Sequence, residues 1–333
     1  MILVTGGAGY VGSVLIPLLV SVGYKVRVYD DFLFGSASLN KLKGKIETEK
    51  GDIREITLKS LKNVDVVIHL AALSNDPMAD FAPKQNFSIN REATKRLVNL
   101  SKKTAVKRFI FASSCSIYDT GNPKIREATE ETAVNPVAYY SLSKFEAEKY
   151  VLGASDVNFC PVVLRKGTIY GYSPRMRFDL VVNTMVKDCL LKKTINVYSN
   201  GEEWRPLIDV NDVARAYLAV VEAPKEQIRN NIFNISFHNY KVKDIAFEVK
   251  KAFNDLNRIN IIIHKKPGKV RSYKVSTKKI QSRLKFSAKV SIRKSVENII
   301  SQIKKNNLQN LSSPAFYNID WMKKKWKKDQ KFA

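Results

Sequence analysis

A glycine-rich turn near the amino terminus restricts the fold of this chain more than any other feature. The segment Thr5-Gly6-Gly7-Ala8-Gly9-Tyr10-Val11-Gly12 lies between an apolar run at 2–5 and a helical pattern at 10–22. Glycine is needed where a backbone must approach a pyrophosphate and where a helix must pack closely on a strand. The start of the helix offers free amides and partial positive charge to an anion. The turn therefore predicts a dinucleotide site, with contacts from Gly6, Gly9, Tyr10, Val11 and Gly12.

Short β-rich runs alternate with helical patterns through the first half of the chain. We expect strands at 2–5, 25–30, 64–70, 108–113 and 159–165, and helices at 10–22, 87–103 and 138–152. This alternation predicts a parallel sheet covered by helices on both faces. The later pattern is looser, with helices expected at 178–191, 211–222 and 241–253 and a strand at 232–236.

The expected fold is therefore α/β, a Rossmann-type doubly wound parallel sheet with a smaller C-terminal substrate lobe. We assign 1–165 to the dinucleotide-binding domain, 166–315 to the substrate-binding lobe and 316–333 to a basic C-terminal tail.

Acidic residues close the second predicted strand. Asp30 follows Gly12 by 18 residues, and its carboxylate can accept hydrogen bonds from the adenosine ribose while repelling a 2′-phosphate. Asp31 adds to that repulsion, so the expected cofactor is NAD and not NADP. Asp52 and Ile53 follow Gly51 in a loop that lies near the adenine in such folds. Asp52 is either a cofactor contact or simply part of a turn.

A tyrosine and a lysine stand four residues apart in the predicted helix at 138–152. This spacing places Tyr140 and Lys144 on one face. A free phenol has a pKa near 10 and is a weak base at neutral pH, but a nearby ammonium favours the phenolate, and the positive charge of NAD⁺ would add to this effect. The strand at 108–113 is followed by serines, and a hydroxyl at a strand's carboxyl end can hold the reacting oxygen beside the phenol. These groups suit proton transfer to and from an alcohol.

Composition limits the class of protein. No run of about 18 apolar residues is present, so no membrane-spanning helix is expected, and no basic region precedes the first apolar run, as a secretory signal would require. The three cysteines, Cys115, Cys160 and Cys189, are far apart. This spacing predicts neither a disulfide framework nor a metal site, and it fits a cytoplasmic protein.

The net charge of +26 comes from 57 basic and 31 acidic side chains. The lysines are spread along the chain, which favours a solvated surface over a nucleic-acid-binding face. The segment from Trp321 to Lys331 carries six lysines and two tryptophans. It is either a solvated tail or a weak contact to an anionic membrane surface.

Together these features resemble the extended short-chain dehydrogenase/reductase family, in its NAD-dependent epimerase/dehydratase branch, over roughly residues 1 to 300. The segments that match family patterns are Thr5–Gly12, Gly51–Arg54, His69–Ala72, Asn90, Ser113–Ser114, Tyr118, Tyr140–Lys144 and Arg205–Asp212. The resemblance implies that Leu70, Ala71 and Ala72 lie along NAD, with Asn90 supporting the cofactor site from a neighbouring helix. By alignment on Tyr118, it makes Ser114 the catalytic hydroxyl, beside Tyr140 and Lys144. It also implies a nucleotide-diphosphate sugar as substrate and a homodimer.

Departures from the family patterns bear on the reaction. Sugar 4,6-dehydratases have Asp-Glu after the catalytic hydroxyl, and decarboxylating relatives have a glutamate in that stretch, whereas Cys115 and Ser116 stand here. Thr168 replaces an asparagine that faces the diphosphate in many epimerases. Arg205 matches an arginine that pairs with substrate phosphate, a role suited to a guanidinium. Further candidates for that role are Arg175, Arg177 and Arg271.

Three functions follow from these observations. The first is NAD-dependent nucleotide-sugar epimerisation, best at C4, through a transient 4-keto sugar. The second is net oxidation or reduction of a nucleotide sugar or another secondary alcohol. The third is a non-catalytic basic binding protein built on a Rossmann shell. The set of Ser114, Tyr140 and Lys144 favours an enzyme, because a mere shell does not need these three groups.

Overall fold

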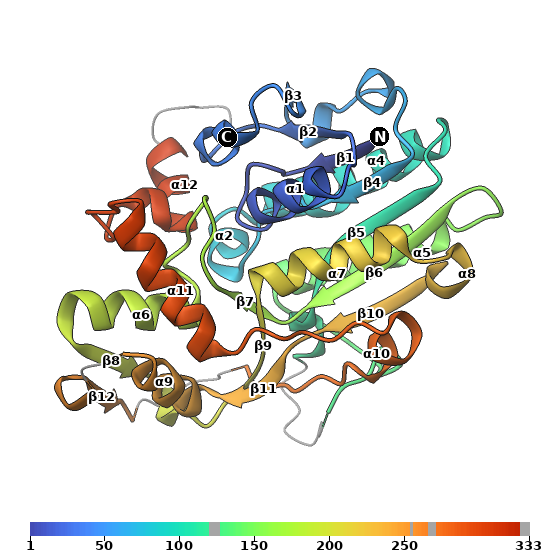
Figure 1. Ribbon diagram of the computed structural model, residues 1–333. Coiled ribbons are helices and arrows are strands. Elements are labelled where there is room, and N and C mark those ends of the chain that lie inside the picture. Colours follow the sequence, from blue (N-terminus) through green and yellow to red (C-terminus); the bar gives the residue numbers. More distant parts are fainter. Residues whose placement is uncertain (120–126, 254–255, 266–270, 327–333) are drawn as a thin grey trace.

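The computed structural model describes residues 1–119, 127–253, 256–265 and 271–326. Its centre is a seven-stranded parallel sheet in the order β10-β6-β5-β4-β1-β2-β3 (Figure 1). The strands are β1 (Ile2–Thr5), β2 (Val26–Asp30), β3 (Glu47–Lys50), β4 (Val66–His69), β5 (Arg108–Ser114), β6 (Cys160–Lys166) and β10 (Asn231–Ile235). The order runs outward in both directions from β1 and β4. This confirms the predicted doubly wound sheet and places the expected ligand crevice at the carboxyl ends of its strands.

Helices cover both faces of this sheet because its inner strands, such as β1, β5 and β6, are buried on both sides. Helices α1 (Gly12–Ser21) and α7 (Val210–Glu222) pack together on one face, and α4 (Ala93–Lys102) and α5 (Tyr139–Gly153) cover the other (Figure 1). Successive side chains of a strand point to opposite faces. In β1, Ile2 and Val4 accordingly pack with α1 and α7, whereas Leu3 packs with α4 and α5.

The remaining elements build the second lobe and the edges of the first. One small sheet has the order β11-β9-β7, and β8 pairs with β12 in another. The strands are β7 (Thr168–Tyr170), β8 (Thr194–Val197), β9 (Trp204–Asp209), β11 (His238–Lys241) and β12 (Asn260–Ile263). The helices are α2 (Asp76–Phe81), α3 (Pro83–Phe87), α6 (Val181–Lys192), α8 (Lys225–Ile228), α9 (Val242–Lys251), α10 (Lys278–Leu284), α11 (Ile292–Lys305) and α12 (Asn318–Trp326). A second apolar core lies among α6, α9 and α11.

The expected boundary at residue 165 does not separate the two lobes. Strand β10 pairs with β6 in parallel, and α7 covers the same sheet, so residues from the later half of the chain complete the first domain. The apolar run at 232–236 predicted the strand itself. Its sheet partner depends on tertiary contacts that a local pattern does not contain.

Residues 316–326 do not form the solvated tail that we expected. Met322 in α12 is 2% exposed and packs against Leu73, Met78 and Ala82, while the Trp321 indole donates a hydrogen bond to the Leu33 carbonyl at 2.6 Å. Apolar side chains hold one face of the helix on the first domain, although lysines follow them. Residues 327–333 of the expected tail lie outside the described residues. Among the described residues, no helix has both the length and the apolar character needed to cross a membrane.

Candidate active site

A cavity of about 460 Å³ lies at the carboxyl ends of the parallel strands, where the strand order reverses. It continues from the glycine-rich turn to the second lobe. Nearly all the site residues expected from the sequence line it: Gly6, Gly9, Tyr10, Val11, Gly12, Asp30, Asp31, Asp52, Ile53, Leu70, Ala71, Ala72, Ser114, Tyr140, Lys144, Thr168, Arg205 and Arg271. The fold therefore brings together residues that are far apart in the sequence.

The glycine-rich turn fits a dinucleotide diphosphate. Gly6 has a φ of +69°, and a Cβ built there would stand 2.6 Å from the Ala71 amide nitrogen. A Cβ on Gly9 would lie 3.1 Å from the Gly6 carbonyl oxygen. The turn therefore packs so closely on itself and on the segment after β4 that these two positions leave little room for a side chain. The amides and partial positive charge of that helix end are suited to the two negative charges of a diphosphate.

Asp30 lies beside this turn, at the end of β2. Its carboxylate accepts hydrogen bonds from the Ala8 amide at 2.9 Å and the Phe32 amide at 2.7 Å. Burial and the neighbouring carboxylate of Asp31 raise the pKa of Asp30 to about 6. Asp31 itself is exposed. At neutral pH this corner carries negative charge, which suits ribose hydroxyls and disfavours a 2′-phosphate.

Asp52 occupies the cavity wall as a turn residue. Its carboxylate accepts from the Arg54 amide at 2.9 Å and pairs with the Arg54 guanidinium at 2.5 Å. Burial opposes ionisation of Asp52, but the bonds from Arg54 outweigh it and lower the pKa of Asp52. The position of Asp52 is thus compatible with both alternatives, a cofactor contact and a turn residue, because a carboxylate that stabilises a turn can still present an oxygen to an adenine.

Asn90 is the exception among the expected cofactor contacts, because it does not line the cavity. It is fully buried. Its side-chain oxygen accepts from the Leu73 amide at 2.8 Å, and its amide donates to the Leu73 carbonyl at 3.0 Å and to Asn86 at 2.8 Å. Asn90 therefore fixes the backbone that follows Leu70–Ala72, and it acts on the cavity through that backbone.

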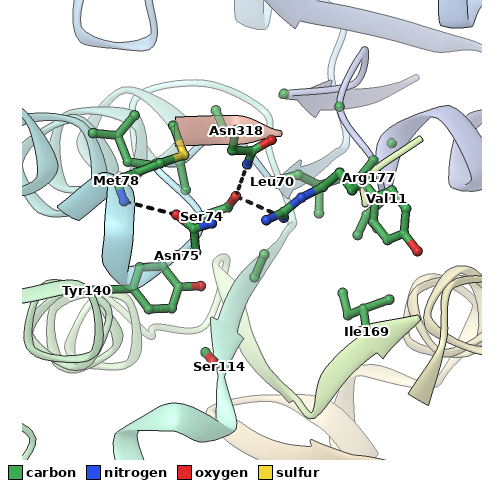
Figure 2. A pocket seen from close by; sticks show the side chains of 18 of the residues that line it. Val11, Leu70, Ser74, Asn75, Met78, Ser114, Tyr140, Ile169, Arg177 and Asn318 are labelled. Atoms are coloured by element: carbon green, nitrogen blue, oxygen red, sulfur yellow. Dashed lines mark hydrogen bonds between the residues drawn. The ribbon is translucent and has the colours of Figure 1, made fainter. Parts of the chain in front are cut away.

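Tyr140, Lys144 and Ser114 all line the cavity. Figure 2 shows the Tyr140 phenol, from α5, and Ser114, at the end of β5, facing the same space. Lys144 lies one helical turn after Tyr140 and is 2% exposed, with its ammonium 4.9 Å from the centre of the Phe111 ring. Burial lowers the pKa of Lys144 to about 7, although the carboxylate of Glu148 partly opposes this.

The acidity of Tyr140 differs from the sequence expectation. Burial and the carboxylate of Asp76 raise the pKa of Tyr140 to about 12, while Ser114, Arg177 and Arg271 lower it. We expected Lys144 to favour the phenolate, but a lysine whose pKa is near 7 is only partly charged at neutral pH. The polypeptide alone therefore keeps the phenol protonated. The positive charge of bound NAD⁺ is the further contribution that ionisation requires.

A second lysine in the cavity was missed in the sequence. Lys166 ends β6, pairs with Ser114 across the sheet and donates to the Ser113 carbonyl at 2.5 Å. Burial and the charge of Lys144 lower its pKa to about 7. The signal was its place at the carboxyl end of a predicted strand, directly after Arg165. In a lysine-rich chain that signal did not stand out.

The substrate side of the cavity contains Thr168 and a pair of arginines. Arg205 donates to the carbonyls of Trp204, at 2.8 Å, and Arg271. Arg271 in turn makes two hydrogen bonds of 2.6 Å to Asp76 and an ion pair of 3.0 Å with Asp119. Asp76 also lines the cavity, and the sequence reasoning missed it. The charge of Arg271 is thus already balanced, whereas Arg205 is held by main-chain oxygens.

The chain is similar to known proteins, among them the following three. It is 28% identical over 315 residues to a putative UDP-glucose 4-epimerase of Methanocaldococcus jannaschii, covering 92% of this chain and 99% of that protein. It is 30% identical over 237 residues to an uncharacterized UDP-glucose epimerase of Bacillus subtilis, covering 67% and 73%. The solved UDP-glucuronic acid 4-epimerase of Bacillus cereus, in complex with UDP-glucuronic acid and NAD, matches with a TM-score of 0.80 at 25% identity, covering 92% and 99%.

The family model described as NAD dependent epimerase/dehydratase matches residues 2–236. This match spans both the glycine-rich turn and the helix that carries Tyr140 and Lys144. The chain therefore belongs to the NAD-dependent epimerase/dehydratase family, whose cofactor is NAD.

Proposed function

We propose that this protein is an NAD-dependent UDP-sugar 4-epimerase. The observation that carries the proposal is the convergence of Ser114, Tyr140 and Lys144 in one cavity with the dinucleotide turn. The two sequence relatives given above carry the names putative UDP-glucose 4-epimerase and uncharacterized UDP-glucose epimerase, which supports the proposal. The positions after Ser114 favour epimerisation over elimination or decarboxylation, because they are occupied by Cys115 and Ser116 and not by acids.

In the proposed reaction, ionised Tyr140 accepts the proton of the C4 hydroxyl and later returns it. Ser114 hydrogen-bonds the same oxygen and holds it beside the phenol. Lys144, one helical turn after Tyr140, supplies positive charge when it is protonated. NAD, when bound, supplies the reversible redox chemistry at C4. General acid–base catalysis of this kind typically contributes about 10²–10⁴-fold to the rate.

Epimerisation further requires that the intermediate 4-keto sugar present either face to the same site. The nucleotide must then be held firmly while the sugar is held loosely. Arg205, on the substrate side, is suited to the diphosphate because a guanidinium can make two parallel hydrogen bonds to it. Arg271 can join it only by exchanging its bonds with Asp76 for bonds to phosphate oxygens. Thr168 offers a hydroxyl in the same region.

The experiment is a product analysis with the purified protein. UDP-glucose and UDP-glucuronic acid are incubated separately with the enzyme and followed by proton NMR, while NADH absorbance is recorded. We expect a C4 epimer to form from at least one of them without accumulation of NADH. NADH formed in proportion to converted sugar would instead identify a net dehydrogenase. Release of carbon dioxide or loss of water from the sugar would identify a decarboxylase or a dehydratase.

A homodimer and a cytoplasmic location stay predictions, supported by the family resemblance and by the scarcity of cysteine. Light scattering on the purified protein measures the first, and fractionation of the source cells measures the second. A monomer at all concentrations used for activity would contradict the dimer.

A further inference from the structure

Arg175 is a buried cation next to the glycine-rich turn. It is 7% exposed and lines the cavity. The segment that carries it is fastened to the turn, because the Ser173 hydroxyl donates to the Tyr10 carbonyl at 2.8 Å and the Tyr10 phenol donates to the Gly171 carbonyl at 2.6 Å. This places Arg175 at the cofactor end of the cavity.

The contacts of Arg175 fix its direction, and among the residues that the structure describes none forms an ion pair with it. Its guanidinium lies 3.8 Å above the Phe34 ring, in the loop that follows Asp30 and Asp31. Its hydrogen bonds go to the Asn318 side-chain oxygen at 2.6 Å and to the Met176 carbonyl at 3.5 Å. Both hydrogen-bond acceptors are neutral groups.

The neighbouring arginine is different. Arg177 makes hydrogen bonds of 2.8 Å and 3.0 Å to the two oxygens of Asp179, so this carboxylate directly balances Arg177. Burial and the neighbouring charge of Arg177 lower the pKa of Arg175, and the carboxylate of Asp179 only partly opposes them. The resulting pKa of Arg175 is about 9. A buried charge without a counterion is costly, and an anion in the cavity would offset that cost.

Asn318 holds Arg175 from the opposite end of the chain. It begins α12, and its amide donates to the Ser74 hydroxyl at 3.0 Å while its backbone nitrogen donates to Asp179 at 3.1 Å. Figure 2 shows Asn318 and Arg177 converging on Ser74 at the cavity wall. An aspartate in place of Asn318 could orient a guanidinium equally well, but it would cancel its charge.

We propose that Arg175 is a cofactor-binding residue that supplies a full positive charge to the diphosphate of NAD. Asn318 is its positioning residue, and it orients the guanidinium without neutralising it. The glycine-rich turn offers amides and a partial charge to the same diphosphate, and Arg175 faces it from the second lobe. The carboxyl-terminal helix thereby becomes part of the cofactor site. This inference rests on the NAD dependence of the family and is independent of which sugar is converted.

The test compares two substitutions of Asn318 by their effect on NADH affinity. If Asn318 acts only through structure, Asn318→Ala should weaken binding more; if it acts by leaving the charge of Arg175 unpaired, Asn318→Asp should weaken binding more. Asn318→Asp keeps an acceptor for Arg175 and pairs its charge, whereas Asn318→Ala removes the acceptor and leaves the charge. We expect Asn318→Asp to weaken NADH binding more than Asn318→Ala does. Arg175→Met should weaken it at least tenfold, which corresponds to about 1.4 kcal/mol. Ser74→Ala is the matched control, because it removes a hydrogen bond of Asn318 without changing charge.

The measurement is the dissociation constant of NADH and of ADP-ribose, which retains the diphosphate but lacks nicotinamide. NADH and ADP-ribose should lose affinity in parallel, whereas adenosine, which lacks the diphosphate, should bind as before. In a protein that already carries Arg175→Met, the further change Asn318→Asp should cause little additional loss of NADH affinity. Thermal unfolding of the cofactor-free variants identifies any that do not fold, and Arg175→Gln, which also removes the charge, then replaces Arg175→Met. NADH binding that is worse in Asn318→Ala than in Asn318→Asp would overturn the proposal. The proposal would also be overturned if Arg175→Met left NADH affinity unchanged and weakened the binding of UDP, because the guanidinium would then belong to the substrate site.

Discussion

Replacing Lys144 with methionine should abolish activity and yet stabilise the cofactor-free protein. Lys144 is buried, and burial lowers its pKa from 10.5 to about 7. A difference of this size corresponds to about 4–5 kcal/mol against the charged form. Methionine has a similar length and no charge, so it can fill the same space against Phe111. The proposed reaction accounts for this cost, because it requires an ammonium at that point.

The stabilisation should depend on pH in one direction. Below about pH 7 the lysine is protonated in both the folded and the unfolded chain, so the full cost of burying the charge is present. Between about pH 7 and pH 10.5 the folded chain loses the proton while the unfolded chain keeps it, and the cost falls. Above that range it disappears. The advantage of Lys144→Met is therefore largest near pH 6 or below and shrinks as the pH rises.

The thermal shift can be estimated from the chain length. An unfolding entropy of about 2.1 cal/mol/K per residue gives roughly 0.7 kcal/mol/K for this chain, so about 4 kcal/mol raises the midpoint by about 6 °C. Lost contacts with Phe111 and Glu148 reduce this to about 3–6 °C.

Differential scanning calorimetry near pH 6 and near pH 9 measures the shift in the cofactor-free protein. Lys149→Met is the matched control, since Lys149 is exposed on the same helix and should change the midpoint little. A lower midpoint for Lys144→Met, or an equal gain at both pH values, would refute the reasoning.

Three further predictions concern the cavity wall. Asp30→Ala should weaken NAD binding and relax discrimination against NADP, as titration with both cofactors would measure; a parent enzyme that binds both equally would contradict the assigned ribose contact. Arg205→Ala should raise KM with little change in kcat, and Arg205→Lys should also be impaired because it lacks the bidentate fork; unchanged kinetics would rule out phosphate binding. Asp76→Asn should move the Tyr140-dependent limb of the kcat/KM profile to lower pH, because Asp76 raises the pKa of Tyr140; an unchanged profile would contradict that coupling.

The sequence predicts the doubly wound domain because its signals are local. Strand β1 and helix α1 flank the glycine-rich turn, and apolar periodicity indicates each of them within two residues of its observed bounds. The sheet formed by β7, β9 and β11 escaped prediction. Its strands are short, and pairings such as Thr168 with Leu207 join positions far apart in the chain.

The site residues likewise fall into those that a local sequence pattern indicates and those that only the folded chain brings together. Tyr140 and Lys144 stand out because one helical turn fixes their spacing, and Asp30 stands out because it closes a strand after the turn. Asp76 and Asn318 carry no local pattern, and the position of Lys166 at a strand end did not stand out in a lysine-rich chain. Asn318 meets Ser74 across 244 positions of sequence, and only the folded chain reveals that contact. Sequence spacing shows that Tyr140 has a lysine neighbour, but it does not show the burial that raises the pKa of Tyr140 in the cofactor-free protein.

The account rests on Tyr140 as the acid and base of the reaction, and Tyr140→Phe tests it most directly. Turnover of a UDP-sugar that the parent enzyme accepts is measured by NMR, together with the dissociation constant of NADH. The account predicts a loss of turnover of at least about 10²-fold, because the proton-transfer group is missing, with NADH affinity nearly unchanged. Near-normal turnover by Tyr140→Phe would contradict the central claim and leave the tyrosine a structural role.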